Sequence, residues 1–208
     1  ALRDQTVGGF REIFDRDLVD ATEKVRLNPR DYGAWVEGIV VYHLIIEGML
    51  ALTGQKFLLG ILREMSLLPG FYSGFTAVAR DESRHVNFGV RALMEAGVRD
   101  PVFLDRVTET IFGLLEPAVR TVAAPDRKFV ITPEESPENV RINPYEVREF
   151  SLNSLTKRLK VVGVAPSVVE EVTKRGVAYY EACWAEYEDN FGEEHPYRFW
   201  DRMATATG

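Results

Sequence analysis

Residues 78–89 read VARDESRHVNFG, and this stretch guides the interpretation of the whole chain. Within it, Glu82 and His85 are three residues apart. On an α-helix two such residues differ by about 60° around the axis and lie less than one turn apart, so both side chains can reach one metal ion. The spacing alone is weak evidence, because Glu and His occur three apart on many exposed helices.

An apolar segment upstream strengthens the metal interpretation. Residues 38–54 read GIVVYHLIIEGMLALTG and are apolar around the whole circumference of a helix, which predicts a helix buried on all sides. Glu47 lies in its middle, where an ionised carboxylate is costly unless it is paired, hydrogen-bonded or bound to a cation. A protonated Glu47, a buried arginine partner and a cation are the three open solutions. We expect no integral membrane segment, because the run is shorter than the ~20 residues of a membrane span and contains His43 and Glu47.

Glu47, Glu82 and His85 together form a candidate ligand set. Two carboxylates and an imidazole suit Fe or Mn, and they also suit Zn. In di-iron and di-manganese proteins of ferritin-like fold, two helices each carry Glu-x-x-His and two more each carry one Glu. His43 lies four residues before Glu47 on the same helical face, so the histidine ligand is His85 or His43, and the motif favours His85. His195 is expected at the surface near the end of the chain.

Hydrophobic periodicity and the proline and glycine breaks predict an all-α chain without sustained strand alternation. Residues 123–144 contain four prolines and are expected to be irregular. The predicted helices cover 10–25, 28–68 (opened by Asn28-Pro29), 71–96 (ended by Gly97), 100–122, 145–160 and 166–190.

Composition favours a single helical domain over residues 1–208. The chain is 46% hydrophobic and 27% charged, so it can bury a sizeable core. The net charge of −7 gives no support to nucleic-acid binding. Cys183 is the one cysteine, which excludes an internal disulfide and fits a reducing compartment, so we expect a cytoplasmic protein. The thiol of Cys183 is predicted to be buried and inert.

The runs YHLIIEGMLA (residues 42–51) and RDESRHVNFG (residues 80–89) resemble the second half of ribonucleotide reductase small-subunit-like proteins, in particular the R2-like ligand-binding oxidases. The 35 residues between Glu47 and Glu82 suit the third and fourth metal-bearing helices of that family. The resemblance implies a ferritin-like helical bundle with a dinuclear Mn/Fe or Fe/Fe centre that activates O2. It also implies a long-chain fatty acid whose carboxylate reaches the metals. We further expect a homodimer.

The resemblance also gives roles to Tyr42 and Asp81. In the oxidases, a tyrosine five residues before the equivalent of Glu47 becomes joined to a valine on an earlier helix through an ether bond, and Tyr42 occupies that position. Five residues turn an ideal α-helix through about 140°, so a π-type widening or a lateral reach is needed to bring the ring of Tyr42 near the metals. The alternative is a buried tyrosine with a bonded hydroxyl. Asp81 is implied to orient a metal-bound histidine from another helix; the alternative is a surface charge or an ion pair with Arg84.

The family pattern includes an earlier Glu and an earlier Glu-x-x-His that this chain lacks. Three glutamates precede Glu47, and none is followed by histidine three residues later. We therefore expect the chain to be the C-terminal part of a longer ferritin-like domain, with Glu47, Glu82 and His85 as three of six ligands. The alternative is a complete protein with a degenerate site.

Four functions are consistent with these patterns. An O2-activating dinuclear oxidase acting on a fatty acid or similar hydrophobic ligand is favoured. A ribonucleotide reductase small subunit, a ferritin-like metal store and a purely structural helical module are the alternatives. Small residues on the two metal-bearing helices permit either close helix packing or a ligand channel: Gly48, Ala51, Gly54, Gly74, Ala77 and Gly89.

Overall fold

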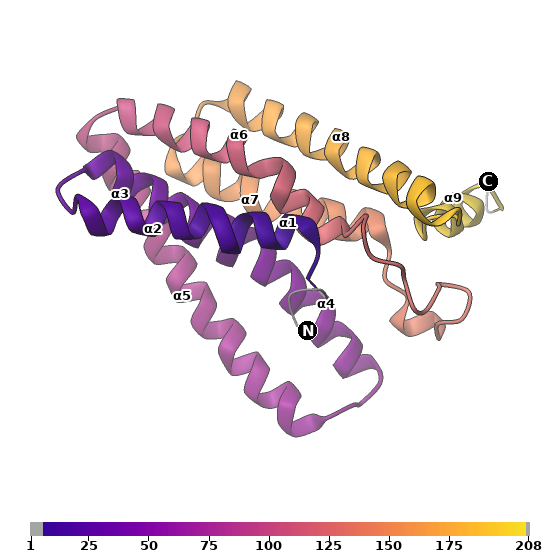
Figure 1. Cartoon of the computed structure of the whole chain (residues 1–208). Coiled ribbons are helices and arrows are strands. Elements are labelled where there is room, and N and C mark those ends of the chain that lie inside the picture. The colour runs from indigo at the N-terminus through magenta and orange to yellow at the C-terminus, as the bar shows by residue number, and fades with distance from the viewer. Residues whose placement is uncertain (1–5, 207–208) are drawn as a thin grey trace.

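The computed structural model describes residues 6–206, and every regular element among them is helical (Figure 1). This confirms the predicted all-α class. In chain order the elements are α1 (Gly8–Arg11), η2 (Glu12–Asp17), α2 (Leu18–Leu27), α3 (Tyr32–Ile39), η3 (Val40–Ala51), α4 (Leu52–Glu64), α5 (Pro69–Arg99), α6 (Val102–Ala123), η4 (Glu138–Val140), α7 (Pro144–Val162), α8 (Pro166–Phe191) and α9 (Tyr197–Ala206).

One continuous helix, formed by α3, η3 and α4, organises the fold. Its central part, η3, is a π-helical segment that packs against α5, α6 and α7. The predicted all-round burial is confirmed, since Leu44, Ile45 and Met49 are fully buried in the shared hydrophobic core. In Figure 1, α4 and the first half of α5 extend away from the rest of the bundle as a helical hairpin.

The segment Tyr32–Glu64 is long and apolar enough to cross a membrane by length and composition. In this fold 61% of its most apolar window is buried inside the protein. Burial of this kind is expected of the central helix of a globular protein, whose apolar surface faces other helices instead of lipid.

Two helix ends differ from the prediction for identifiable reasons. The long helix begins at Tyr32 and not at Asn28-Pro29, because the Asp31 carboxylate accepts a hydrogen bond from the Ala34 amide at 3.0 Å and caps the first turn. Helix α5 continues past Gly97 to Arg99. At Gly97 the missing side chain makes room for Leu104 of α6, so this glycine permits close packing instead of ending the helix.

The remaining boundaries agree with the prediction within a few residues, except at the two ends of the described chain. The first helix contains a π-helical stretch, η2, between α1 and α2. Helix α9 lies beyond the last predicted helix, which covers 166–190. Periodicity is a weak signal over so few residues.

The cap at Asp31 gives a first testable prediction. Asp31→Ala is expected to lower the free energy of unfolding by about 1 kcal/mol, because the Ala34 amide loses its acceptor. Asp31→Asn keeps an acceptor oxygen and is expected to cost much less. Urea unfolding of the three proteins measures the difference, and equal stability of the alanine variant and the parent would contradict the capping role.

Candidate metal site

The structure brings Glu47, Glu82 and His85 together. Glu47 comes from η3, and the other two residues come from neighbouring positions on α5. One ligand atom from each side chain lies within 4.8 Å of those of the other two. The Nδ1 atom of His85 is 3.4 Å from Oε1 of Glu47 and 3.6 Å from Oε2 of Glu82. A single ion placed among these atoms would be within reach of all three side chains.

The two carboxylates occupy an environment that suits a cation. Glu47 is 3% exposed, and the buried Oε2 atom of Glu82 has no hydrogen-bond partner among the described residues. Burial, and then the negative charge of Glu47, raise the pKa of Glu82 above its ordinary value. A bound cation would relieve both the repulsion and the unpaired oxygen. The donor set therefore fits a metal such as Fe or Mn.

His43 holds the other side of Glu47. Its Nδ1 atom lies 2.6 Å from Oε2 of Glu47, whereas His85 approaches Oε1 of the same carboxylate. The ring of His43 packs edge-on against Phe88 of α5, with ring centroids 5.5 Å apart. His85 is therefore the histidine that lies with the two carboxylates in the candidate site. His43 is placed to orient Glu47, as the hydrogen-bond partners of metal ligands commonly do.

Gly89 determines how closely η3 and α5 approach. A β-carbon added at Gly89 would overlap the Cβ atom of His43. Of the two uses considered for small residues on these helices, close packing is the one the structure shows at this position.

Tyr42 lies beside the two carboxylates because of the π-helical backbone. Hydrogen bonds between residues i and i+5 widen the turn, which brings the fifth residue along the chain toward the same face. Burial and then the charges of Glu47 and Glu82 raise the pKa of Tyr42. Tyr42 is 44% exposed among the described residues, and the choice between a cross-linking and a structural tyrosine stays a prediction. Its ring stands edge-on to His43, with centroids 5.0 Å apart.

Asp81 forms the alternative ion pair that the sequence allowed. Its Oδ1 atom accepts a hydrogen bond from Arg84 at 3.0 Å, and both side chains are mostly exposed. Its Oδ2 atom lies 3.9 Å from Nε2 of His85. A role for Asp81 in orienting a histidine from another helix stays a prediction.

The prediction that His195 is a surface residue is wrong. His195 is 2% exposed, and its ring stacks on Trp184 with centroids 5.5 Å apart. Burial lowers the pKa of His195 to about 4, so the ring is neutral at physiological pH. Its aromatic neighbours in the sequence, including Tyr197, were the available signal for this burial. The buried thiol predicted at Cys183 is confirmed, since the side chain is 3% exposed, and this burial raises the pKa of the thiol to about 11.

The fold is that of the ferritin-like, R2-like proteins, as structural comparison shows. A variant of an R2-like ligand-binding oxidase with an aerobically reconstituted Mn/Fe cofactor matches with a TM-score of 0.67 at 20% identity, over 76% of this chain and 56% of that one. A second variant of such an oxidase matches with a TM-score of 0.53 at 16% identity, over 86% of this chain and 54% of that one. The expected resemblance to these oxidases is therefore confirmed at the level of the fold.

Sequence comparison finds similarity to a ribonucleotide reductase subunit. The ribonucleoside-diphosphate reductase subunit beta of Chlamydia pneumoniae is 27% identical over 111 residues, which cover 53% of this chain and 32% of that protein. No protein-family model matches the chain. These relatives are oxidoreductase-type proteins, and the oxidase structures carry a Mn/Fe cofactor. The chain spans about half the length of the oxidases and about a third of the reductase subunit.

The close approach at Gly89 gives a second prediction. Gly89→Ala is expected to lower the free energy of unfolding by about 1–3 kcal/mol and to weaken metal binding, because the added methyl group pushes His43 and Glu47 away from α5. Gly74→Ala on the same helix is the matched control, since a β-carbon there meets nothing within 4 Å.

Urea unfolding and metal titration of the two glycine variants measure the effect. The control is expected to be neutral, or more stable by up to ~1 kcal/mol through helix propensity. Identical behaviour of the two variants would show that the contact at Gly89 does not matter.

Proposed function

We propose that this chain provides Glu47, Glu82 and His85 to the dinuclear metal centre of an O2-activating oxidoreductase. The observation that carries the proposal is the convergence of two poorly solvated carboxylates and an imidazole, with one buried carboxylate oxygen left unpaired. The shared fold of the Mn/Fe oxidases supports it. A Mn/Fe or Fe/Fe pair held here would supply the one-electron and O2 chemistry that amino-acid side chains lack.

The protein's part in this chemistry is positioning. His43 holds Oε2 of Glu47, which leaves Oε1 directed toward His85 and the proposed ion. The buried side chains of η3 keep water away from Glu47, and Glu82 offers an oxygen with no competing hydrogen bond. Low solvation strengthens the attraction between these carboxylates and a cation.

The remaining ligands are proposed to come from helices outside this chain, packed against η3 and α5. Large apolar side chains along the same two elements remain exposed, and their burial by further helices would be favourable. Exposed side chains of this kind include Tyr42 of η3 and Phe71, Val78, Phe88 and Met94 of α5. A complete dinuclear site built only from residues 1–208 would contradict this part of the proposal.

The substrate proposed for this site is a long-chain fatty acid or a similar hydrophobic molecule. The support is the ligand-binding character stated for the oxidases that share the fold. We also propose that the protein is a homodimer. A cytoplasmic location is proposed because the buried thiol of Cys183 fits a reducing compartment.

Removal of Glu47 tests the metal site directly. Glu47→Ala in the full-length protein is expected to reduce metal occupancy at the nearer position by at least about tenfold, since losing even an outer partner of a ligand commonly costs that much. Glu95→Ala on α5 is the control, because Glu95 is exposed and is not one of the three candidate ligands. Elemental analysis and anomalous scattering at the Mn and Fe edges give occupancy and metal identity, and unchanged occupancy in Glu47→Ala would overturn the assignment.

Tyr42 tests which branch of the superfamily the chain follows. We propose that Tyr42 is oxidised with O2 as the electron acceptor, losing its phenolic hydrogen while a valine outside this chain loses a β-hydrogen, and that an O–C bond joins them. The linked peptides would then weigh about two mass units less than their sum, as two hydrogens leave in a two-electron oxidation.

Mass spectrometry of protein loaded with metal with and without O2 detects this bond, and Tyr42→Phe is the control that cannot form it. Unmodified Tyr42 after full metal loading and exposure to O2 would exclude the cross-link.

A ribonucleotide reductase small subunit is the second candidate, favoured by the sequence match to a reductase beta subunit. That role requires a large catalytic subunit to receive the radical. Nucleotide reduction on mixing with such a subunit would establish this alternative, and its absence together with oxidation of a hydrophobic ligand would favour the oxidase.

A further inference from the structure

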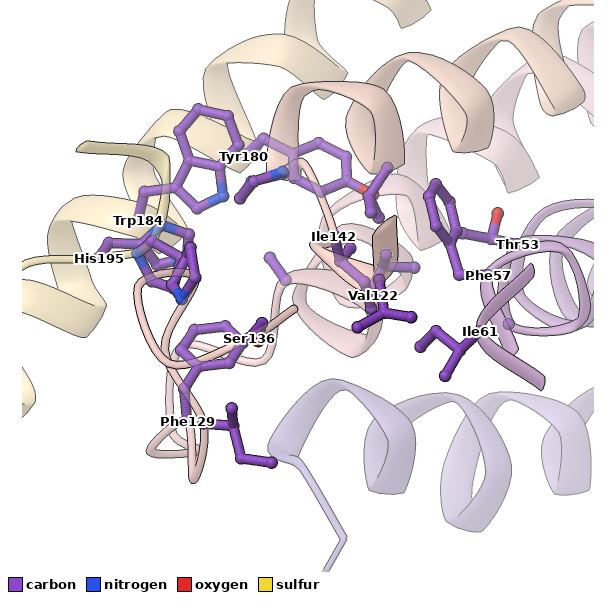
Figure 2. A pocket seen from close by; sticks show the side chains of 18 of the residues that line it. Thr53, Phe57, Ile61, Val122, Phe129, Ser136, Ile142, Tyr180, Trp184 and His195 are labelled. Atoms are coloured by element: carbon purple, nitrogen blue, oxygen red, sulfur yellow. The ribbon is translucent and has the colours of Figure 1, made fainter. Parts of the chain in front are cut away.

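A cavity of about 710 Å³ lies apart from the candidate metal ligands. It is bounded by α4, the end of α6, the irregular segment 124–143, the start of α7, and α8 (Figure 2). None of Glu47, Glu82 and His85 lines it. Its volume falls within the range of about 300–1,000 Å³ that is usual for small-molecule sites.

Most of the cavity wall is apolar. Phe57 and Ile61 of α4 face Val122 of α6 and Ile142 across the space, and Phe129 covers another side (Figure 2). These side chains would bury the hydrocarbon part of a ligand, which is favourable in proportion to the apolar area removed from water.

One end of the cavity offers two N–H donors. The amide of Tyr197 donates to Nδ1 of His195 at 3.1 Å, so the ring proton of this neutral histidine is on Nε2. Trp184 stacks on the same ring, and Figure 2 shows its indole nitrogen on the side that faces the cavity. Within residues 6–206 neither His195 Nε2 nor Trp184 Nε1 has a hydrogen-bond partner. An acceptor atom on a ligand would satisfy such donors.

The other polar groups of the wall already have partners. The hydroxyl of Tyr180 is bonded to Ser151 at 2.7 Å, and the hydroxyl of Thr53 donates to the Met49 carbonyl at 2.6 Å. Polar recognition is therefore concentrated at the end that carries Trp184 and His195.

The charge of the wall disfavours an anionic ligand. Glu135 is the single charged side chain among the described lining residues, and no lysine or arginine accompanies it. The backbone and side chain of Thr132 both donate to Glu135, which lowers its pKa and keeps it negative. A carboxylate in this cavity would lack a counter-ion and would be repelled by Glu135.

We propose that this cavity binds an uncharged, mainly apolar molecule with one hydrogen-bond acceptor, such as a ketone or aldehyde carbonyl, directed at Trp184 and His195. This site goes beyond the proposed function, because the ligand proposed for the metal centre is a fatty acid with a carboxylate at the metals. It does not depend on a metal being bound.

Two probes of equal chain length test the ligand class in the full-length protein. 2-Decanone is expected to bind at least about tenfold more tightly than decanoate at pH 8, a difference of 1.4 kcal/mol. Calorimetric titration measures both affinities. Decanoate binding as tightly as the ketone would overturn the proposed class.

Variants test the place of binding. Gly54 lines the cavity, and a β-carbon there meets nothing within 4 Å, so Gly54→Leu would occupy the space without disturbing the helix. Gly54→Leu is expected to weaken the binding of 2-decanone at least about tenfold, as the loss of a few buried methylene contacts would. Gly60→Leu is the matched control on α4, since a β-carbon at Gly60 is equally free and Gly60 does not line the cavity.

Trp184→Phe tests the polar end, since it keeps an aromatic ring and removes the N–H donor. The affinity for 2-decanone is expected to fall about fivefold, because one hydrogen bond is lost. Titration of the metal-depleted protein separates this site from the metal centre. The proposal of a separate cavity would be overturned if Gly54→Leu left ketone binding unchanged, or if ketone binding disappeared when the metal was removed. The metal analysis of Glu47→Ala tests the metal centre alone.

Discussion

A carboxylate inside an apolar helix is the constraint on which the rest of the structure depends. Glu47 is buried in the π-helical segment η3, where an ionised group needs compensation from its neighbours. His43 contacts one of its oxygens and His85 approaches the other. Glu82, beside them, adds a second carboxylate instead of neutralising the first. Glu47 thus has two histidine contacts and a second carboxylate beside it, which is why a cation is the natural completion of this site.

The backbone is adapted to the same site. The π-helical turn places Tyr42 near Glu47 although they are five residues apart, and π-helical segments often mark functional positions. Gly89 lets α5 approach closely enough for His43 to fit between the two helices. Both features lower the stability of the helices that contain them, since a π-turn is less favourable than an α-helical turn and an interior glycine is less favourable than an alanine. Their occurrence together next to buried charges is the pattern expected at a functional site.

One long helix serves two chemically different regions. Its η3 part carries Glu47, and its α4 part forms a wall of the apolar cavity. The first region is anionic and suits a metal, whereas the second is apolar with two free N–H donors and suits an uncharged molecule. The irregular segment 124–143 closes the cavity, so the proline-rich stretch has a structural role that its composition did not indicate.

The sequence by itself determined the helical class, most helix boundaries and the candidate ligands Glu47, Glu82 and His85, because periodicity and i, i+3 spacing are local properties of a chain. It left the roles of His43 and Tyr42 open, since both depend on the π-helical backbone, which long-range packing selects. It misplaced His195 at the surface because burial there comes from the packing of Trp184 and Tyr197 against its ring after the chain turns back on α8. The cavity was likewise decided only by tertiary structure, because its walls come from segments more than 100 residues apart whose side chains leave a space that no local pattern encodes.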